Sequence, residues 1–149
     1  MRRIVYLDHA ATSWPKPEAV GAEIARLLAD LTANPGRSGH RPALASARLI
    51  FSVRSRLARL LGVPDPANLV FTRGATEGLN LVIKGFLRTG DRVAVSPLEH
   101  NSVMRPLMRL AHERGILIET LPADGYGRID LGLAERLAGR YRLAVVAHA

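Results

Sequence analysis

A glycine, an alanine and a hydroxyl residue stand in the order Gly74-Ala75-Thr76 at the expected start of a helix. The β-branched and aromatic run before them predicts a strand over 68–72, and the spacing after them predicts a helix over 75–87. The first N–H groups of a helix are unpaired and lie at the positive end of its dipole, so this turn suits a phosphate. The alternative is an ordinary helix start, in which Thr76 or Thr72 supplies the capping oxygen and Gly74 makes the turn.

A histidine follows a second expected strand. The apolar run 92–96 predicts a buried strand, and the loop after it holds His100. Because ligands of open α/β sheets bind beyond the carboxyl ends of the strands, we expect His100 and the Gly74 turn at the same edge. The alternative for His100 is a loop histidine bonded to backbone, with Asn101 capping the next helix.

Strands and helices alternate from residue 68 onward, which predicts a mostly parallel α/β sheet with flanking helices. The strands are expected at 68–72, 92–96, 116–121 and 142–147, and the helices at 75–87, 101–114 and 130–139. Helical spacing predicts two earlier helices, one that begins near Pro17 and one over 43–61. We expect residues 1–65 to form an N-terminal arm with helices and residues 66–149 to begin the α/β domain.

The composition excludes several classes of protein. The absence of cysteine excludes disulfides and cysteine–zinc sites, and the five histidines lack any spacing typical of a metal site. No apolar run is long enough to cross a membrane, and the first residues do not resemble a signal peptide, so a cytoplasmic protein is expected. The formal charge is +8, but the arginines are scattered, which favours a solvated helical surface over a nucleic-acid site.

Four segments carry a specific resemblance because of their order and spacing. They are Tyr6-Leu7-Asp8-His9-Ala10-Ala11-Thr12, Asn34-Pro35-Gly36-Arg37-Ser38-Gly39-His40, Val70-Phe71-Thr72-Arg73-Gly74-Ala75-Thr76-Glu77 and Glu99-His100-Asn101-Ser102-Val103. Together they resemble the N-terminal part of the class V aminotransferase family, the cysteine desulfurase-like pyridoxal-phosphate enzymes, over essentially the whole chain. The resemblance implies the large-domain portion of the pyridoxal-phosphate-dependent transferase fold, which is aspartate aminotransferase-like and of fold type I.

The resemblance implies a role for each matched residue at the cofactor. Gly74, Ala75 and Thr76 correspond to the turn that binds the cofactor phosphate through backbone N–H groups and a hydroxyl. His100 corresponds to the histidine that stacks on the pyridine ring and is proposed, in desulfurases, to move protons. The family pattern therefore makes His100 the catalytic candidate and implies pyridoxal 5′-phosphate as cofactor.

Residues of the first two segments correspond to loops that border the substrate pocket in the family, sometimes across a dimer interface. These residues are Ala10, Ala11 and His40. For His40, a role in bracing its own loop is an equal alternative.

Two groups that this chemistry needs lie beyond the matched region in the family. They are the lysine that forms a Schiff base with the cofactor and the aspartate at its pyridine nitrogen. Lys16 opens a helix, and Lys84 lies about 12 Å along the helix from Thr76 at about 1.5 Å per residue, so neither substitutes for that lysine.

We therefore expect the N-terminal fragment of a larger enzyme that acts on an amino acid by sulfur or amino-group transfer. The isolated chain is expected to be inactive and marginally stable, because its last strand would leave an unprotected sheet edge. The resemblance also implies a homodimer in full-length form and a sulfur acceptor protein as a further candidate partner. The alternative function is a non-catalytic phosphate- or nucleotide-binding α/β module.

Overall fold

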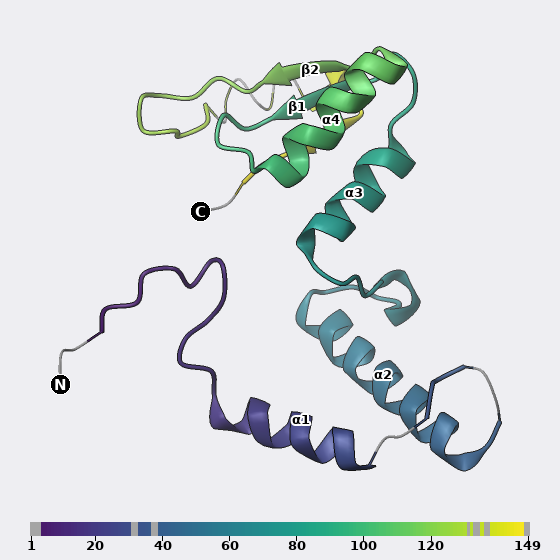
Figure 1. Cartoon of the computed structure of the whole chain (residues 1–149). Helices are drawn as coiled ribbons and strands as arrows, with labels where there is room; N and C mark the ends of the chain where they lie inside the picture. The colour runs from purple at the N-terminus through teal and green to yellow at the C-terminus, as the bar shows by residue number, and fades with distance from the viewer. Residues whose placement is uncertain are drawn as a thin grey trace. The chain divides into compact units, whose positions relative to one another are not determined.

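The computed structural model describes residues 4–30, 33–36, 39–130, 132, 135 and 138–147. The chain divides into two compact units, Met1–Val70 and Phe71–Ala149, which Figure 1 draws together. Each unit is described by itself below.

The first unit is helical. It contains α1 (Glu18–Asp30), α2 (Arg41–Leu60) and the 3-10 turn η1 (Pro66–Asn68). The two α-helices confirm the predicted ones. Just after the C-terminal cap of α2, Gly62 adopts the left-handed region at a φ of 67°, which glycine accepts without a steric penalty.

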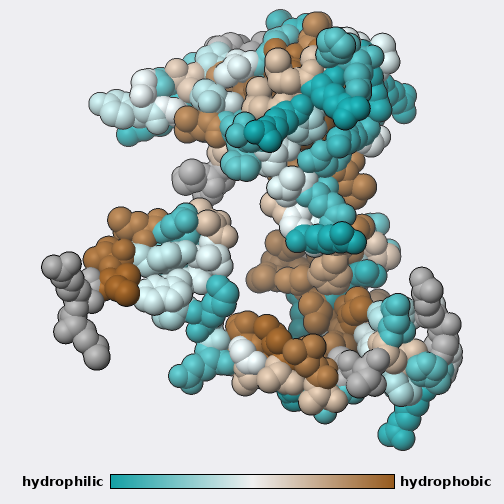
Figure 2. All heavy atoms as spheres, in the orientation of Figure 1, coloured by the Kyte–Doolittle hydropathy of each residue, from teal (hydrophilic) through white to brown (hydrophobic). Residues whose placement is uncertain are grey.

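The apolar residues of α1 follow helical spacing but remain exposed. Val20, Ile24 and Leu28 are 43%, 54% and 75% exposed, and α1 has no buried residue. Figure 2 shows brown, hydrophobic spheres at the place that α1 occupies in Figure 1. Residues 4–30 therefore carry an apolar surface without a core of their own.

The second unit alternates helices with strands that form one parallel sheet. Its elements are α3 (Ala75–Phe86), β1 (Arg92–Val95), α4 (Asn101–Arg114), β2 (Leu117–Thr120), η2 (Ala138–Arg140) and β3 (Leu143–Val145). The strand order is β2-β1-β3, and β1 pairs in parallel with both neighbours. The predicted parallel sheet with flanking helices is confirmed, and the order puts the carboxyl ends of β1 and β3 side by side.

Two predicted elements need correction or fall partly out of view. The strand predicted over 68–72 is wrong, because η1 ends at Asn68 and residues 69–72 have no regular structure. A strand needs a hydrogen-bonded neighbour, and residues 68–72 pair with none of the three strands in the described sheet. The helix predicted over 130–139 lies largely outside the described residues; Gly132 and Glu135 are α-helical, and Ala138–Arg140 is a 3-10 turn.

The core of the second unit lies between the sheet and the helices α3 and α4. Val93 and Leu107 are fully buried, and Ile83 of α3 is 1% exposed. The other buried members of this cluster are Leu87, Val95, Val103, Leu110 and Ile116. The Arg114 guanidinium on α4 also donates to the carbonyl oxygens of Lys84 and Leu87, at 3.2 and 2.9 Å. Apolar packing and these hydrogen bonds therefore fix α3 on α4.

The opposite face of the sheet carries a polar cluster. Glu119 is in register with Ala94, so it lies on the face that Arg92 also occupies. The Tyr141 hydroxyl donates to Glu119 Oε2 at 2.7 Å, and the Arg92 guanidinium pairs with Glu119 Oε1. The Tyr141 hydrogen bond, with help from Arg92, lowers the pKa of Glu119, and the same bond raises the pKa of Tyr141.

Candidate cofactor-binding groove

The start of α3 is not capped by a side chain. Gly74 is the N-terminal cap residue, and neither Thr76 nor Thr72 supplies a capping oxygen. Thr72 Oγ1 instead donates to the Gly74 carbonyl at 3.0 Å, and Glu77 Oε2 accepts the Arg73 N–H at 2.6 Å. The capping alternative for the two threonines is therefore wrong. Among the residues that the structure describes, no side chain accepts a hydrogen bond from the first-turn N–H groups of α3, which no helical carbonyl can reach.

The alternative interpretation of His100, a histidine bonded to backbone, is correct for the bond, but His100 and not Asn101 caps α4. The His100 Nδ1 accepts the Ser102 N–H at 3.1 Å and lies 2.9 Å from Ser102 Oγ, while Asn101 is the first helical residue. The His100 Nδ1 thus accepts the N–H of the second residue of the helix, as the side-chain oxygen of an Asp, Asn, Ser or Thr cap does. Because Nδ1 is the acceptor, the neutral ring carries its proton on Nε2.

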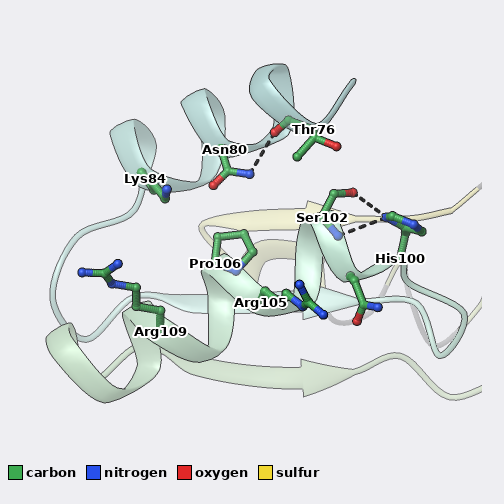
Figure 3. Close-up of a pocket in the computed structure, with 9 residues that line it drawn as sticks. Thr76, Asn80, Lys84, His100, Ser102, Arg105, Pro106 and Arg109 are labelled. Carbon is green, nitrogen blue, oxygen red and sulfur yellow. Dashed lines mark hydrogen bonds between the residues drawn. The ribbon is translucent and has the colours of Figure 1, made fainter. Parts of the chain in front are cut away.

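The helices α3 and α4 line one groove of about 410 Å³, which runs from Thr76 to Lys84 on α3 and from His100 to Arg109 on α4. Thr76 and His100, the residues predicted for the phosphate and the ring of a cofactor, both border it. Figure 3 shows Thr76, Asn80 and Lys84 along α3, facing α4. The remaining lining residues are Asn101, Ser102, Arg105, Pro106 and Arg109. Gly74 and Ala75 line a second cavity of about 690 Å³, which shares Thr76, Asn80 and Lys84 with the groove.

Packing of α3 on α4, rather than two strand ends, brings Thr76 and His100 together. The sequence pattern predicts a strand over 68–72 with Thr76 beyond its carboxyl end, but this segment is not a strand. Buried packing of Ile83 on α3 and Leu107 on α4 holds the two helices together instead. The two residues thus share a groove for a different physical reason than the one expected.

Sequence reasoning missed most of the charge in the groove. Of the described residues that line it, Lys84, Arg105 and Arg109 are cationic and none is acidic. Arg109 also pairs with Glu113, Nε to Oε1, at 2.7 Å. Lys84 is exposed, as expected, and it still lines the groove. The available signal was the interval of four residues, 76/80/84 on one helix and 101/105/109 on the other, which places each set on one face.

The residues predicted for a substrate pocket lie in the first unit. Ala10 and Ala11 belong to a turn in which the Ala11 N–H donates to the Asp8 carbonyl at 3.2 Å. His40 caps α2, with Nδ1 accepting the Ala43 N–H at 3.3 Å. Their assignment to a substrate pocket stays a prediction.

The described ranges hold neither a cluster of metal ligands nor a membrane-spanning helix. Within them, no group of three or more histidine or acidic side chains has the arrangement of a metal site. None of the helices in that part of the chain is both long and apolar enough to cross a membrane.

Comparison with known proteins identifies the family. The family model for class-V aminotransferases matches residues 5–149. The chain belongs to this family. It is 40% identical over 147 residues to a probable cysteine desulfurase of Pseudomonas aeruginosa, and the match covers 96% of the chain and 36% of that protein. The chain thus spans about a third of the length of the curated relatives it matches.

Solved structures confirm the predicted fold. The apo cysteine desulfurase of Thermococcus onnurineus is 29% identical with a TM-score of 0.84, over 96% of this chain and 36% of that one. The α-aminoadipate aminotransferase LysN of Thermus thermophilus, complexed with N-(5′-phosphopyridoxyl)-L-leucine, is 26% identical with a TM-score of 0.55, over 86% of this chain and 31% of that one. The class-V chain therefore has the large-domain architecture of pyridoxal-phosphate enzymes.

Proposed function

We propose that the groove between α3 and α4 forms the phosphate and ring portion of a pyridoxal 5′-phosphate site. The whole enzyme would act on an amino acid, cysteine first among the candidates, by sulfur or amino-group transfer. The observation that carries the proposal is the presence of Thr76 and His100 in one groove. The likeness to proteins named as cysteine desulfurases supports the reaction class.

The start of α3 fits a phosphate dianion. Its first-turn N–H groups point out of the helix at the positive end of the dipole, and no side chain caps them. In the proposal, the N–H groups of Ala75 and Thr76 and the Thr76 hydroxyl donate to phosphate oxygens. Arg73, which lines the same cavity, adds positive charge.

His100 fits an aromatic ring with a nearby proton. Its Nδ1 is held by Ser102, which restricts the orientation of the imidazole at the edge of the groove. In the proposal, the imidazole face packs on the pyridine ring and Nε2 holds a proton that can move to or from the substrate. The bound cofactor supplies an electron sink for reactions at the amino acid's α-carbon.

The rest of the expected assembly belongs to the same proposal. Ala10, Ala11 and His40 would border the substrate, and a homodimer and a sulfur acceptor protein would complete a cytoplasmic enzyme. The exposed apolar residues of α1 support a surface that meets a partner. The likeness to desulfurases supports the acceptor.

Pyridoxine 5′-phosphate tests the groove directly. This compound lacks the aldehyde, so it cannot react with the amines of Lys16 or Lys84. We expect the purified chain to bind it about tenfold or more tightly than pyridoxine, since hydrogen bonds to a charged group contribute about 1.5–3 kcal/mol. Calorimetric titration measures both affinities, and inorganic phosphate should compete.

Two outcomes would count against the proposal. Equal affinity for pyridoxine and its phosphate would remove the phosphate assignment. Tighter binding of adenosine monophosphate than of pyridoxine 5′-phosphate would favour the non-catalytic nucleotide-binding module. His100→Ala should weaken binding of the phosphorylated ring while leaving competition by inorganic phosphate intact.

A further inference from the structure

One carboxylate oxygen joins the ends of two neighbouring strands. Glu99 Oε1 accepts the Ser96 hydroxyl at 2.6 Å and the Ala147 N–H at 2.7 Å. Ser96 directly follows β1 and is 4% exposed, and Ala147 lies two residues after β3. The backbone ladder between these strands reaches the Ser96 N–H, which donates to the Val145 carbonyl at 3.0 Å. Glu99 therefore extends the pairing of β1 and β3 beyond that bond.

The same carboxylate stands next to His100. We infer that Glu99 is a positioning residue that holds the loop over 97–100 against the carboxyl end of β3 and so fixes His100 at the groove. The role of His100 in this inference rests on the proposed function, whereas the strand contact does not. His100 is then anchored on both sides, by Glu99 before it and by its own bond to Ser102 after it.

A second contact holds the same loop. The Leu98 side chain lies over Gly127, where an added Cβ would come within 2.7 Å of Leu98 Cδ1. Gly127 also has a φ of 80°, a conformation that glycine adopts readily. The loop therefore lies beside the Gly127 turn through Leu98, a side chain that is 62% exposed, and contacts the end of β3 through the Glu99 carboxylate.

The chemistry of the contact favours a carboxylate. Two donors converge on one oxygen, and a charged acceptor makes such bonds shorter and stronger than a neutral one. The alternative acceptor for the Ala147 N–H is Ser96 Oγ at 3.4 Å, which is a long bond. Removing the carboxylate should therefore release Ala147 from the loop.

Amide hydrogen exchange of the full chain tests the strand contact. We expect Glu99→Ala to speed exchange of the Ala147 N–H about tenfold, a lost bond to a charged group being equivalent to about 1.4 kcal/mol or more. The Arg142 N–H, which donates to the Arg92 carbonyl in the same sheet, should keep its rate. Glu99→Gln should give a smaller effect, and the matched control Glu23→Ala, on exposed α1, should give none.

The link to His100 needs a second readout. In Glu99→Ala, the ring resonances of His100 should shift and pyridoxine 5′-phosphate should bind about tenfold more weakly, the loss expected for one well-placed interaction. Unchanged Ala147 exchange would overturn the inference, and so would unchanged His100 resonances. Faster exchange of Arg142 together with Ala147 would also overturn it, because Glu99 would then support only general stability.

The two proposals fail in different ways. If the unmodified chain does not bind pyridoxine 5′-phosphate, the proposed function fails, and the exchange of Ala147 still decides the strand contact. If Glu99→Ala does not fold, Glu99→Gln gives the decision, because its side-chain carbonyl keeps the shape of the contact without the charge. An unchanged Ala147 rate in Glu99→Gln would then overturn the inference.

Discussion

Thr76→Ala should weaken the phosphate site without abolishing it. The substitution removes one hydroxyl donor at the start of α3, while the backbone N–H groups and the helix dipole remain. Alanine has the highest helix propensity, so α3 itself should be no less stable. The change therefore isolates the hydroxyl.

The expected magnitude follows from exposure. A hydrogen bond to a charged group contributes about 1.5–3 kcal/mol. Thr76 is exposed, so water can replace the lost donor and the low end of that range applies. The result is about a tenfold higher Kd for pyridoxine 5′-phosphate, equivalent to about 1.4 kcal/mol.

Calorimetric titration of three variants separates the hydroxyl from other effects. Thr76→Ser keeps the donor and should stay within about threefold of the unmodified chain, since a 0.7 kcal/mol change corresponds to about that factor. Thr89→Ala, an exposed threonine beyond the end of α3, is the matched control and should change nothing. Equal affinities for Thr76→Ala and the unmodified chain would refute the assignment, as would an equal loss in Thr89→Ala.

Two further predictions concern the framework of the second unit. Ile83→Ala should cost about 3 kcal/mol in urea unfolding, because it opens a cavity where α3 packs on α4, and it should also weaken pyridoxine 5′-phosphate binding. The matched control Leu81→Ala, 61% exposed on the same helix, should stay within about 0.5 kcal/mol, and an equal loss there would contradict this packing argument. The pKa of Glu119 is lower in the folded chain than its ordinary value of 4.5, so Glu119 should stabilise the fold at pH values above 4.5. This stabilisation should be lost as the pH falls through the lower pKa of the folded state. Tyr141→Phe removes the main cause, so its unfolding free energy should fall less between neutral pH and acid than that of the unmodified chain; an identical pH dependence would show that the hydrogen bond has no such effect.

Local sequence patterns were sufficient for the helices and for the family. The helix over 101–114 ends where predicted, because Gly115 adopts the left-handed region at a φ of 64° and closes the last turn. The start of α3 at Ala75 likewise follows from Gly74 and the apolar spacing after it. Such features depend on residues within one turn of each other, so one stretch of sequence contains the whole cause.

Patterns that depend on a partner were less informative. The run over 68–72 has the composition of a strand, yet composition does not supply the neighbour to which a strand must bond. Asn101 is a good capping residue, but the ring of His100 accepts the Ser102 N–H and caps the helix instead. The missing strand neighbour could be identified only in three dimensions, whereas the choice of His100 over Asn101 is a competition between adjacent residues.

The sequence by itself determined that Gly74-Ala75-Thr76 begins a helix, that another helix covers 101–114 directly after His100, and that the order of these segments resembles one enzyme family. The sequence also placed Thr76 and His100 at one site, but only the tertiary structure decided that packing of α3 on α4 brings them together, that Lys84 and Arg105 line the groove, and that Glu99 reaches Ala147. The physical reason is distance along the chain. A helix start depends on neighbouring residues. In contrast, the groove joins Thr76 and His100, which are 24 positions apart, and the Glu99–Ala147 contact joins residues 48 positions apart. These residues come together because Ile83 and Leu107 are buried in one core and because β1 pairs with β3. A local sequence pattern specifies neither of these contacts.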